Sequence, residues 1–254
     1  MMIYIIFIHF FVYLGLLTKN QQPMNQPQKT EQNFISPQSL PFESVLLPDE
    51  KDRLYNATNK VEYAKRDIIV KQNARVSEIP LVLSGLVKIS REMRRGKSVI
   101  LRIAQPGSFL GLSSIFGSDV YEYSVFALEN VSVRFVDIET FRWLIENNGL
   151  FGLEVVKQLS ADNIFNINRL SSLLYKQLPG RVADIILYFS EDIFKSNTFT
   201  IPLTRQELAE LAGTTKESLI RTLSEFKHDK IIDMNRNYFQ VNSMHIVKTL
   251  SRLG

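Results

Sequence analysis

One stretch, from Thr204 to Phe226, constrains the fold more than any other part of the sequence. It has the spacing of two short helices interrupted at Gly213, a residue suited to a left-handed turn. The apolar stripes of the two helices consist of Leu208, Leu211, Leu219, Leu223 and Phe226. Two short helices joined by so tight a turn predict either a helix-turn-helix or an ordinary pair of antiparallel helices.

The starts of both predicted helices carry the same capping signal. A threonine is followed three residues later by a glutamate, Thr204 with Glu207 and Thr214 with Glu217, so hydroxyl and carboxylate can satisfy backbone N–H groups reciprocally. The second helix has an alternative cap in Thr215. With Thr214 as the cap, Glu217 folds back onto the backbone. With Thr215 as the cap, Glu217 is freer to face outward.

Two strand-like runs come after the second helix and decide between the alternatives for the fold. Ile231–Met234 and Tyr238–Val241 flank the turn-rich triplet 235–237, a pattern typical of a β-hairpin. Helix, turn, helix and hairpin together predict a winged helix. Burial of the apolar stripe leaves an outer face on the second helix, made of Lys216, Glu217, Ile220, Arg221 and Ser224. A basic, hydrogen-bonding face at the start of such a helix suits reading of the DNA major groove.

This part of the chain resembles the DNA-binding motif of the Crp-Fnr superfamily of bacterial transcription regulators. The likeness is carried by the run Leu203–Ala209, then Gly213, Lys216, Glu217, Ser218 and Arg221, and it extends from about residue 46 to residue 248. The resemblance implies that Lys216, Glu217 and Arg221 reach base edges. It also places a second group near the phosphates, namely Thr204, Arg205, Gln206, Thr215 and Ser218. Lys216 departs from the arginine more usual at its position, whereas Arg221 matches the motif.

Composition limits the classes of function that remain open. The chain has 254 residues, 45% of them hydrophobic and 22% charged, which is enough for two modest globular domains. Its net charge of +4 gives only weak support for a polyanionic partner. The sequence contains no cysteine, which excludes disulfides, thiol redox sensing and Cys-ligated zinc or iron–sulfur clusters. The branch of the family that senses oxygen through such a cluster is therefore excluded.

The first residues of the chain differ from the rest. Residues 1–17 are almost continuously apolar, at the short edge of what spans a bilayer, and they lack the basic start and cleavage site of a secretory signal. If this segment spanned a membrane, Lys19 would favour a cytoplasmic location for the domain after it. The alternative, which we favour, is that the protein starts at Met24. Residues 20–41, rich in Gln, Asn, Pro and Ser, are typical of a flexible leader in either case.

A series of short apolar runs with turn signals between them comes after a helix predicted over residues 42–59. The runs are Asp67–Val70, Ile79–Leu83, Leu86–Ser90, Ser98–Ala104, Tyr123–Leu128 and Val131–Asp137. The pair Arg95-Gly96 lies where a hairpin must turn. Evenly spaced strands with such turns indicate a jelly-roll or small barrel. The runs Leu83–Lys88 and Pro106–Gly111 also resemble signature runs of a cyclic-nucleotide-binding barrel.

The residues after Gly111 decide what such a barrel can bind. A cyclic nucleotide's phosphate needs free backbone N–H groups in a glycine-rich turn and an arginine to pair with it. In nucleotide-binding members of the family, a glutamate after this glycine takes the ribose hydroxyl, and an arginine–serine pair takes the phosphate. This chain has Leu112 in place of the glutamate and Tyr123-Ser124 in place of the arginine–serine pair. We therefore expect a pocket that is not built for cyclic AMP.

Two alternatives to cyclic AMP stay open for this barrel. It binds a less polar small molecule, or it binds no ligand at all. The candidate pocket residues are Gly111, Leu112, Ser113, Tyr123, Ser124 and Asn166. Completing turns and strand faces is the simpler role open to the polar members of this set. Haem is unsupported, because the three histidines, His9, His228 and His245, lie outside the barrel.

A long helix is predicted from Leu153 to Gln177. Its heptad seam, with spacings of three and four, consists of Leu153, Val156, Ser160, Asn163, Ile167, Leu170 and Leu174. The polar Ser160 and Asn163 lower the stability of such a seam but can fix its register. An ordinary helix that lies on the barrel through Val155 and Leu159 is the alternative. Because members of the resembled family pair through this helix, we expect a homodimer.

Pro179-Gly180 should end the long helix and mark a hinge, before an amphipathic helix over residues 181–194. The predicted fold class is α+β, with an N-terminal jelly-roll β-barrel, a long dimerisation helix and a C-terminal winged helix-turn-helix. The predicted parts are an apolar segment and leader over 1–41, a cyclic-nucleotide-binding-like sensor barrel over 42–148, the dimerisation helix over 149–178 and the DNA-binding domain over 179–254.

These expectations describe a cytoplasmic, homodimeric regulator of transcription that binds palindromic double-stranded DNA in a sequence-specific manner. RNA polymerase is a further expected partner if the protein activates transcription. A membrane is not an expected partner. An enzyme is not expected, because the sequence has neither a P-loop nor a recognisable catalytic constellation. The alternative is a non-DNA regulatory or ligand-binding subunit built on the same barrel. Such a subunit needs neither Lys216 nor Arg221 on an exposed helix face, so the winged helix argues against it.

Overall fold

The computed structural model describes residues 40–56, 58–93 and 98–254. Both alternatives for the N-terminal segment, and the hairpin turn predicted at Arg95-Gly96, lie outside the described residues. The described chain begins with a short 3-10 helix, η1 (Pro41–Val45), and continues into helix α2 (Pro48–Asn56). The helix predicted over 42–59 is therefore two shorter ones. Within the described part, none of the helices is long and apolar enough to cross a membrane.

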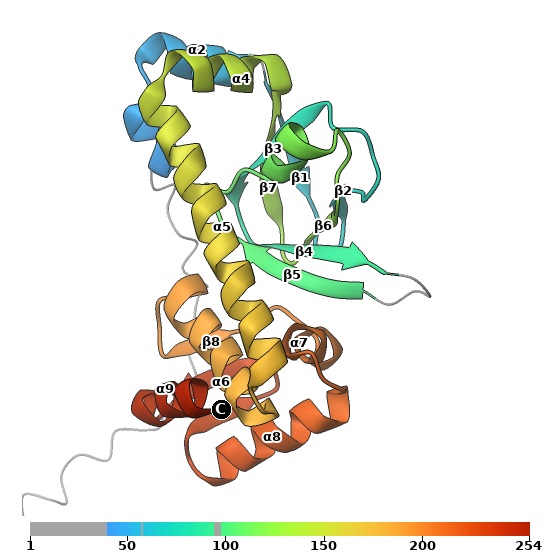
Figure 1. Cartoon of the computed structure of the whole chain (residues 1–254), viewed down its shortest axis with the longest axis vertical. Helices are drawn as coiled ribbons and strands as arrows, with labels where there is room; N and C mark the ends of the chain where they lie inside the picture. The colour runs from blue at the N-terminus through green and yellow to red at the C-terminus, as the bar shows by residue number, and fades with distance from the viewer. Residues whose placement is uncertain (1–39, 57, 94–97) are drawn as a thin grey trace, which may run out of the picture. The chain divides into compact units, whose positions relative to one another are not determined.

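The strands after α2 form a jelly-roll of antiparallel sheets (Figure 1). As far as the described residues show, one sheet has the order β1-β7-β3 and the other the order β2-β6-β4-β5. The strands are β1 (Thr58–Tyr63), β2 (Ile68–Val70), β3 (Glu78–Ser84), β4 (Val87–Glu92), β5 (Ser98–Ala104), β6 (Ser124–Ala127) and β7 (Val131–Asp137). This arrangement confirms the predicted fold class. Strand β1 was missed, because its mostly polar residues alternate only weakly and pair with β7 alone.

The barrel core extends into the helices that flank it. The Phe109 ring packs against Phe42 of η1, Phe141 of α4 (Ile138–Asn147) and Phe151 of α5 (Gly149–Tyr175), with centroid distances of 4.9, 5.1 and 5.9 Å. Tilted and edge-on aromatic pairs at this spacing add to the hydrophobic gain of burial. The turn before α3 (Leu112–Gly117) is therefore anchored to the start of α5.

Helix α5 is the long helix predicted from the heptad seam. It begins earlier than expected, because the Asn148 side chain accepts hydrogen bonds from the Leu150 and Phe151 N–H groups. It ends at Tyr175, and α6 (Leu178–Leu187) begins after two residues. Pro179 and Gly180 lie in the first turn of α6, where the missing N–H of a proline costs little. Helix α6 continues as a π-helical segment, η3 (Tyr188–Ile193).

The C-terminal part is a winged helix-turn-helix, as predicted. It comprises β8 (Thr198–Thr200), α7 (Arg205–Ala212), α8 (Lys216–His228), β9 (Ile232–Asn235), β10 (Tyr238–Val241) and α9 (Met244–Leu253). Strand β8 adds to the hairpin, giving the order β8-β10-β9. Its three residues were too few to be recognised in the sequence, and α9 was not predicted either. The hairpin of β9 and β10 is the wing of the motif. The rings of Phe199 in β8 and Phe239 in β10 stack with their centroids 6.0 Å apart, and both belong to the core that the sheet shares with the helices.

Candidate nucleic-acid interface

The first helix of the helix-turn-helix motif has the predicted capping box. The Thr204 hydroxyl accepts from the Glu207 N–H at 3.2 Å, and the Glu207 carboxylate accepts from the Thr204 N–H at 2.8 Å. The helix ends at Gly213, with φ of 62° in the left-handed region. A Cβ atom at this position would lie 2.4 Å from the Leu173 side chain of α5. Both the backbone angle and the neighbouring side chain therefore favour glycine.

The second helix is capped by Thr215, so the capping box predicted for Thr214 is wrong. The Thr215 hydroxyl accepts from the Ser218 N–H at 3.2 Å, while the Thr214 N–H donates to the Ala209 carbonyl and closes the turn between the helices. Glu217 consequently occupies the second position of α8 and is exposed. This is the arrangement in which its carboxylate is free of the backbone.

Helix α8 has one apolar face and one polar face. Leu219, Leu223 and Phe226 are buried, as the sequence predicts. Lys216, Glu217 and Arg221 are exposed on the other side, and within the described residues their side chains have no hydrogen-bond or ion-pair partner. Charged groups of this kind, presented at the start of a helix, are available to a ligand without breaking any internal contact.

The side chains expected near phosphates differ in how they are held. Thr204, Gln206 and Thr215 are exposed, and Ser218 is partly buried. The Arg205 guanidinium instead donates to the Arg236 carbonyl oxygen in the wing turn and lies 5.2 Å above the Phe239 ring. In this structure Arg205 therefore braces the wing against α7, a contact that the sequence did not indicate.

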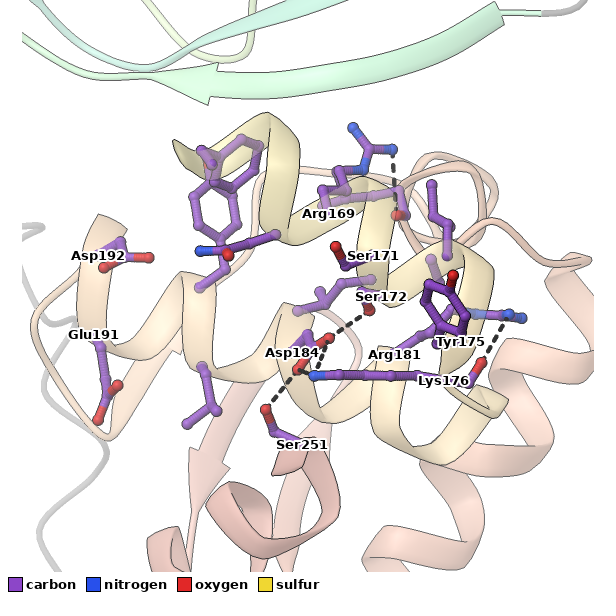
Figure 2. Close-up of a pocket in the computed structure, with 18 residues that line it drawn as sticks. Arg169, Ser171, Ser172, Tyr175, Lys176, Arg181, Asp184, Glu191, Asp192 and Ser251 are labelled. Carbon is purple, nitrogen blue, oxygen red and sulfur yellow. Dashed lines mark hydrogen bonds and ion pairs between the residues drawn. The ribbon is translucent and has the colours of Figure 1, made fainter. Parts of the chain in front are cut away.

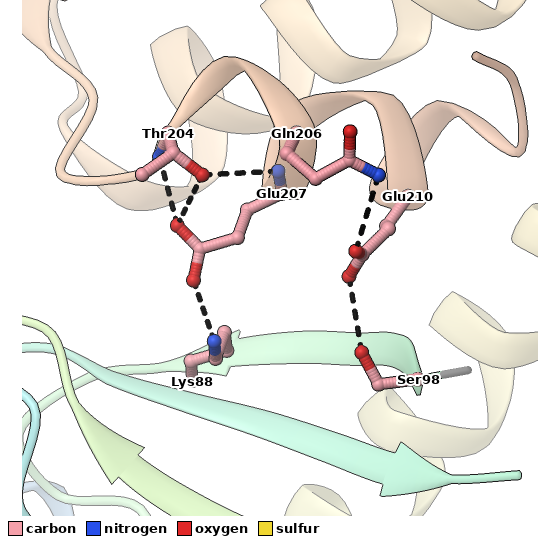
Figure 3. A network of polar contacts seen from close by, with 6 residues as sticks. All are labelled: Lys88, Ser98, Thr204, Gln206, Glu207 and Glu210. Atoms are coloured by element: carbon pink, nitrogen blue, oxygen red, sulfur yellow. Dashed lines mark hydrogen bonds and ion pairs between the residues drawn. The ribbon is translucent and has the colours of Figure 1, made fainter. Parts of the chain in front are cut away.

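A polar network joins α7 to the barrel (Figure 3). Lys88 of β4 donates to the Glu207 carboxylate at 2.5 Å, and Ser98 of β5 donates to Glu210 at 3.3 Å. Burial alone would raise the pKa of Glu207, but the hydrogen bonds from Lys88 and Thr204 outweigh it and hold the pKa below its ordinary value. Glu207 therefore both caps α7 and binds the β4–β5 hairpin.

The candidate effector residues differ in their burial and in their contacts. Leu112 is buried in the barrel core, and Ser113 is exposed. Ser124 accepts from the Gln72 N–H at 3.0 Å, and Asn166 is exposed on α5. Gly111 and Tyr123 do meet, through a hydrogen bond from the Gly111 N–H to the Tyr123 hydroxyl at 2.7 Å.

A groove of about 510 Å³ lies along α5, α6 and η3 (Figure 2). Asp184 stands at its centre and accepts hydrogen bonds from Ser172 of α5, from Lys176 directly after α5 and from Ser251 of α9. These contacts join α5, α6 and α9. The positive charge of Lys176 balances the negative charge of the Asp184 carboxylate. We assign the groove wall a structural role, because its central charges satisfy one another.

The predicted dimer seam is exposed along its whole length. All of its members lie on the side of α5 that faces away from the barrel contacts: Leu153, Val156, Ser160, Asn163, Ile167, Leu170 and Leu174. Leu174 is 68% exposed and Leu170 59%. The opposite side of α5 is occupied, since Phe151 and Val155 are buried in the barrel core. Exposed apolar side chains along one side of a helix, here interrupted by Ser160 and Asn163, are a feature of interaction surfaces.

Comparison with known proteins matches both halves of the chain. Residues 60–148 match the cyclic nucleotide-binding domain family, and residues 180–247 match the Crp-like helix-turn-helix domain family. The CRP-like cAMP-activated global transcriptional regulator of Mycobacterium tuberculosis is 26% identical over 152 residues, 58% of this chain and 68% of that protein. The anaerobic regulatory protein of Bacillus subtilis is 23% identical over 211 residues, 81% of this chain and 88% of that protein.

Solved structures show the same fold. FixK2 from Bradyrhizobium japonicum superimposes with a TM-score of 0.70 at 17% identity, covering 76% of this chain and 96% of that one. The c-di-GMP responsive global regulator CLP from Xanthomonas campestris gives a TM-score of 0.66 at 19% identity, covering 76% and 98%. At these identities the likeness is evidence for the fold alone.

A sensor-type barrel, a long helix and a winged helix-turn-helix define the class of DNA-binding transcription regulators. The chain belongs to the Crp-Fnr superfamily, because the two family models together match most of it and its relatives include a CRP-like regulator and an anaerobic regulatory protein. Crp-like regulators bind DNA through the helix-turn-helix and are typically dimeric.

Proposed function

We propose that this protein is a homodimeric, cytoplasmic regulator that recognises palindromic DNA by placing α8 of each protomer in the major groove. The observation that carries the proposal is the exposed set of Lys216, Glu217 and Arg221, which have no partner among the residues that the structure describes, on a helix whose other face is buried. Arginine and lysine match the acceptor atoms of guanine, and glutamate accepts from the amino group of cytosine. The protein acts by binding DNA rather than by catalysis.

The dimer in this proposal forms through α5. The exposed stripe from Leu153 to Leu174 lies on the side of the helix opposite to its barrel contacts, so a second copy can pair with it without disturbing the protomer. A two-fold pair of α8 helices reads two half-sites about one DNA turn apart, ~34 Å, which is why the site should be palindromic. If the regulator activates transcription, RNA polymerase is the further partner.

The effector in this proposal is not cyclic AMP. The Mycobacterium tuberculosis relative is named as cAMP-activated. This chain, however, has the buried Leu112 where the family's ribose-binding glutamate is expected, and Tyr123 where the phosphate-binding arginine is expected. Loss of a charge-assisted pair with the phosphate removes about 1.5–3 kcal/mol of interaction. Titration calorimetry with cyclic AMP and cyclic GMP tests this point, and a micromolar dissociation constant for either nucleotide would refute it.

Selection of binding sites from random double-stranded DNA tests the main proposal. Purified protein should enrich a palindrome, and Arg221→Ala should enrich a palindrome that is degenerate at one position in each half-site. Arg142→Ala is the matched control, because it removes the same charge from an exposed position on α4. Failure of the protein to enrich any sequence, with or without cell extract, would favour the non-DNA regulatory subunit instead.

A further inference from the structure

The turn that ends at Gly111 is closed by side chains of the same chain. Gly111 has φ of 84°, and its N–H donates to the Tyr123 hydroxyl at 2.7 Å. A Cβ atom on Gly111 would lie 2.6 Å from the Tyr121 ring, so the turn is held between two tyrosines. The Tyr121 hydroxyl donates to the Glu78 carbonyl oxygen at 2.6 Å, which fixes that ring against β3.

Helix α5 closes the turn from its other side. The Gln158 amide accepts from the Phe109 N–H at 3.1 Å and donates to the Phe109 carbonyl at 2.7 Å. One helical turn further, Asp162 pairs with Arg102 of β5 at 2.9 Å. The charges of Arg102 and Asp162 both influence the pKa of Tyr123, the first lowering it and the second raising it. Burial raises the pKa of Tyr123, and its hydroxyl is therefore neutral at physiological pH.

These contacts use the hydrogen-bond donors that an anionic ligand would need. A barrel that binds an anion offers it a backbone N–H in a glycine turn and an arginine side chain. Here the Gly111 N–H already holds the Tyr123 oxygen, and the Arg102 guanidinium already holds the Asp162 carboxylate. We infer that Tyr123 and Asp162 act as an internal ligand, whose oxygen atoms take the place of an external effector and keep α5 docked on the barrel.

The side of α5 that contacts the barrel also contacts the DNA-binding domain. Two helical turns after Asp162, the Arg169 guanidinium donates to carbonyl oxygens of two β5 residues and, at 3.3 Å, to that of Leu211 in α7. Gln158, Asp162 and Arg169 are separated by four and seven residues, so one side of the helix contacts both domains. A change at the Gly111 turn is thereby coupled to α7.

The functional consequence of the internal ligand rests on the proposed DNA binding. A regulator whose barrel carries its own ligand binds its sites at full affinity with no small molecule added. An external anion must first displace the Tyr123 oxygen from Gly111 and the Asp162 carboxylate from Arg102. The displaced carboxylate would then be left partly buried without its cation, which opposes the exchange.

The first test uses the full chain without DNA. Tyr123→Phe removes the acceptor oxygen and keeps the ring. Tyr55→Phe is the matched control, since it removes a hydroxyl that bonds to Glu43, away from the Gly111 turn. Hydrogen exchange of the Gly111 amide, measured by NMR, should become about tenfold faster in Tyr123→Phe and stay unchanged in Tyr55→Phe. An unchanged Gly111 rate in Tyr123→Phe overturns the inference.

The second test measures DNA affinity. Wild-type affinity for a selected site should be the same with and without millimolar cyclic AMP or cyclic GMP, and an increase with either overturns the inference. Tyr123→Ala should bind about tenfold more weakly, and 4-methylphenol, which supplies the lost ring and hydroxyl, should restore the affinity where toluene does not. Equal rescue by toluene would mean that the hydroxyl is not the ligand. If the wild type binds no DNA at all, the proposed function fails, and the Gly111 exchange rates still decide about the internal ligand.

Discussion

Replacement of Arg221 by alanine is the most direct test of how this protein reads DNA. Arg221 lies on the exposed side of α8, and within the described chain its guanidinium has no partner. Its removal therefore breaks no internal contact, and the free energy of unfolding should change by less than about 0.5 kcal/mol. Any larger effect on DNA binding must come from contacts with DNA.

The size of the expected loss depends on the chemistry of the contact. A good bidentate pair between an arginine and guanine discriminates against a wrong base by about 1–3 kcal/mol, so Arg221→Ala should weaken binding to the preferred site by a factor of ~5–150. Binding to scrambled DNA should weaken much less, because phosphate attraction there depends on total charge. The loss should also be confined to one base pair in each half-site.

The assay is fluorescence anisotropy titration of wild type, Arg221→Ala and Arg142→Ala against specific and scrambled duplexes at several salt concentrations. Arg142→Ala removes an equal charge at an exposed site on α4 and should leave the difference between the two duplexes unchanged. Equal losses on both duplexes for Arg221→Ala would show that Arg221 holds phosphate. The assignment of Arg221 to base reading would then be wrong.

Four further outcomes are expected from the contacts of the winged helix. Arg205→Ala should lower the melting temperature, because the guanidinium braces the wing at Arg236; if Arg205 also contacts phosphate, as the sequence predicts, the salt slope of DNA binding becomes shallower. Thr215→Ala should cost about 1 kcal/mol in chemical unfolding, the typical value of a lost helix cap, and no change would mean that the cap does not form. Lys88→Ala and Glu207→Gln should each destabilise the chain by about 1 kcal/mol without adding in the double variant; full additivity would show that the two groups do not interact. Since the folded pKa of Glu207 lies below its ordinary 4.5, this ion pair should stabilise the chain above pH 4.5 and be lost as pH falls through the lowered value, as thermal melts of wild type and Glu207→Gln would show.

Local signals in the sequence were enough to predict both helices of the helix-turn-helix, but not the exact start of α8. The capping box of α7 depends only on Thr204 and Glu207, three residues apart, and it is present. The choice between Thr214 and Thr215 depended on whether the Thr214 N–H would be taken by Ala209, in the preceding helix. No helix-cap pattern contains that information, because it arises from how tightly the turn at Gly213 closes. The heptad seam of α5 was recognised for the same reason as the first cap, since its period is a local property of the chain.

Contacts between distant parts of the chain could not be predicted from patterns. Lys88 and Glu207 are 119 positions apart, and each is equally plausible as an ordinary surface charge in its own segment. Tyr123 was noticed only as a departure from an expected arginine. That its hydroxyl would fill the turn at Gly111 depends on the packing of Tyr121, which in turn depends on a carbonyl oxygen of β3. Such chains of packing contacts are set by the tertiary structure as a whole.

The two sides of α5 bear on how the proposed dimer seam could include polar residues. On its docked side, the barrel and α7 hold the helix through Gln158, Asp162 and Arg169. The position and rotation of α5 are therefore fixed within one protomer before any second copy arrives. In the proposed dimer, a seam that is already oriented would lose less conformational freedom on pairing, so it would need less apolar contact. Ser160 and Asn163 would then fix the register of that dimer at the expense of some stability.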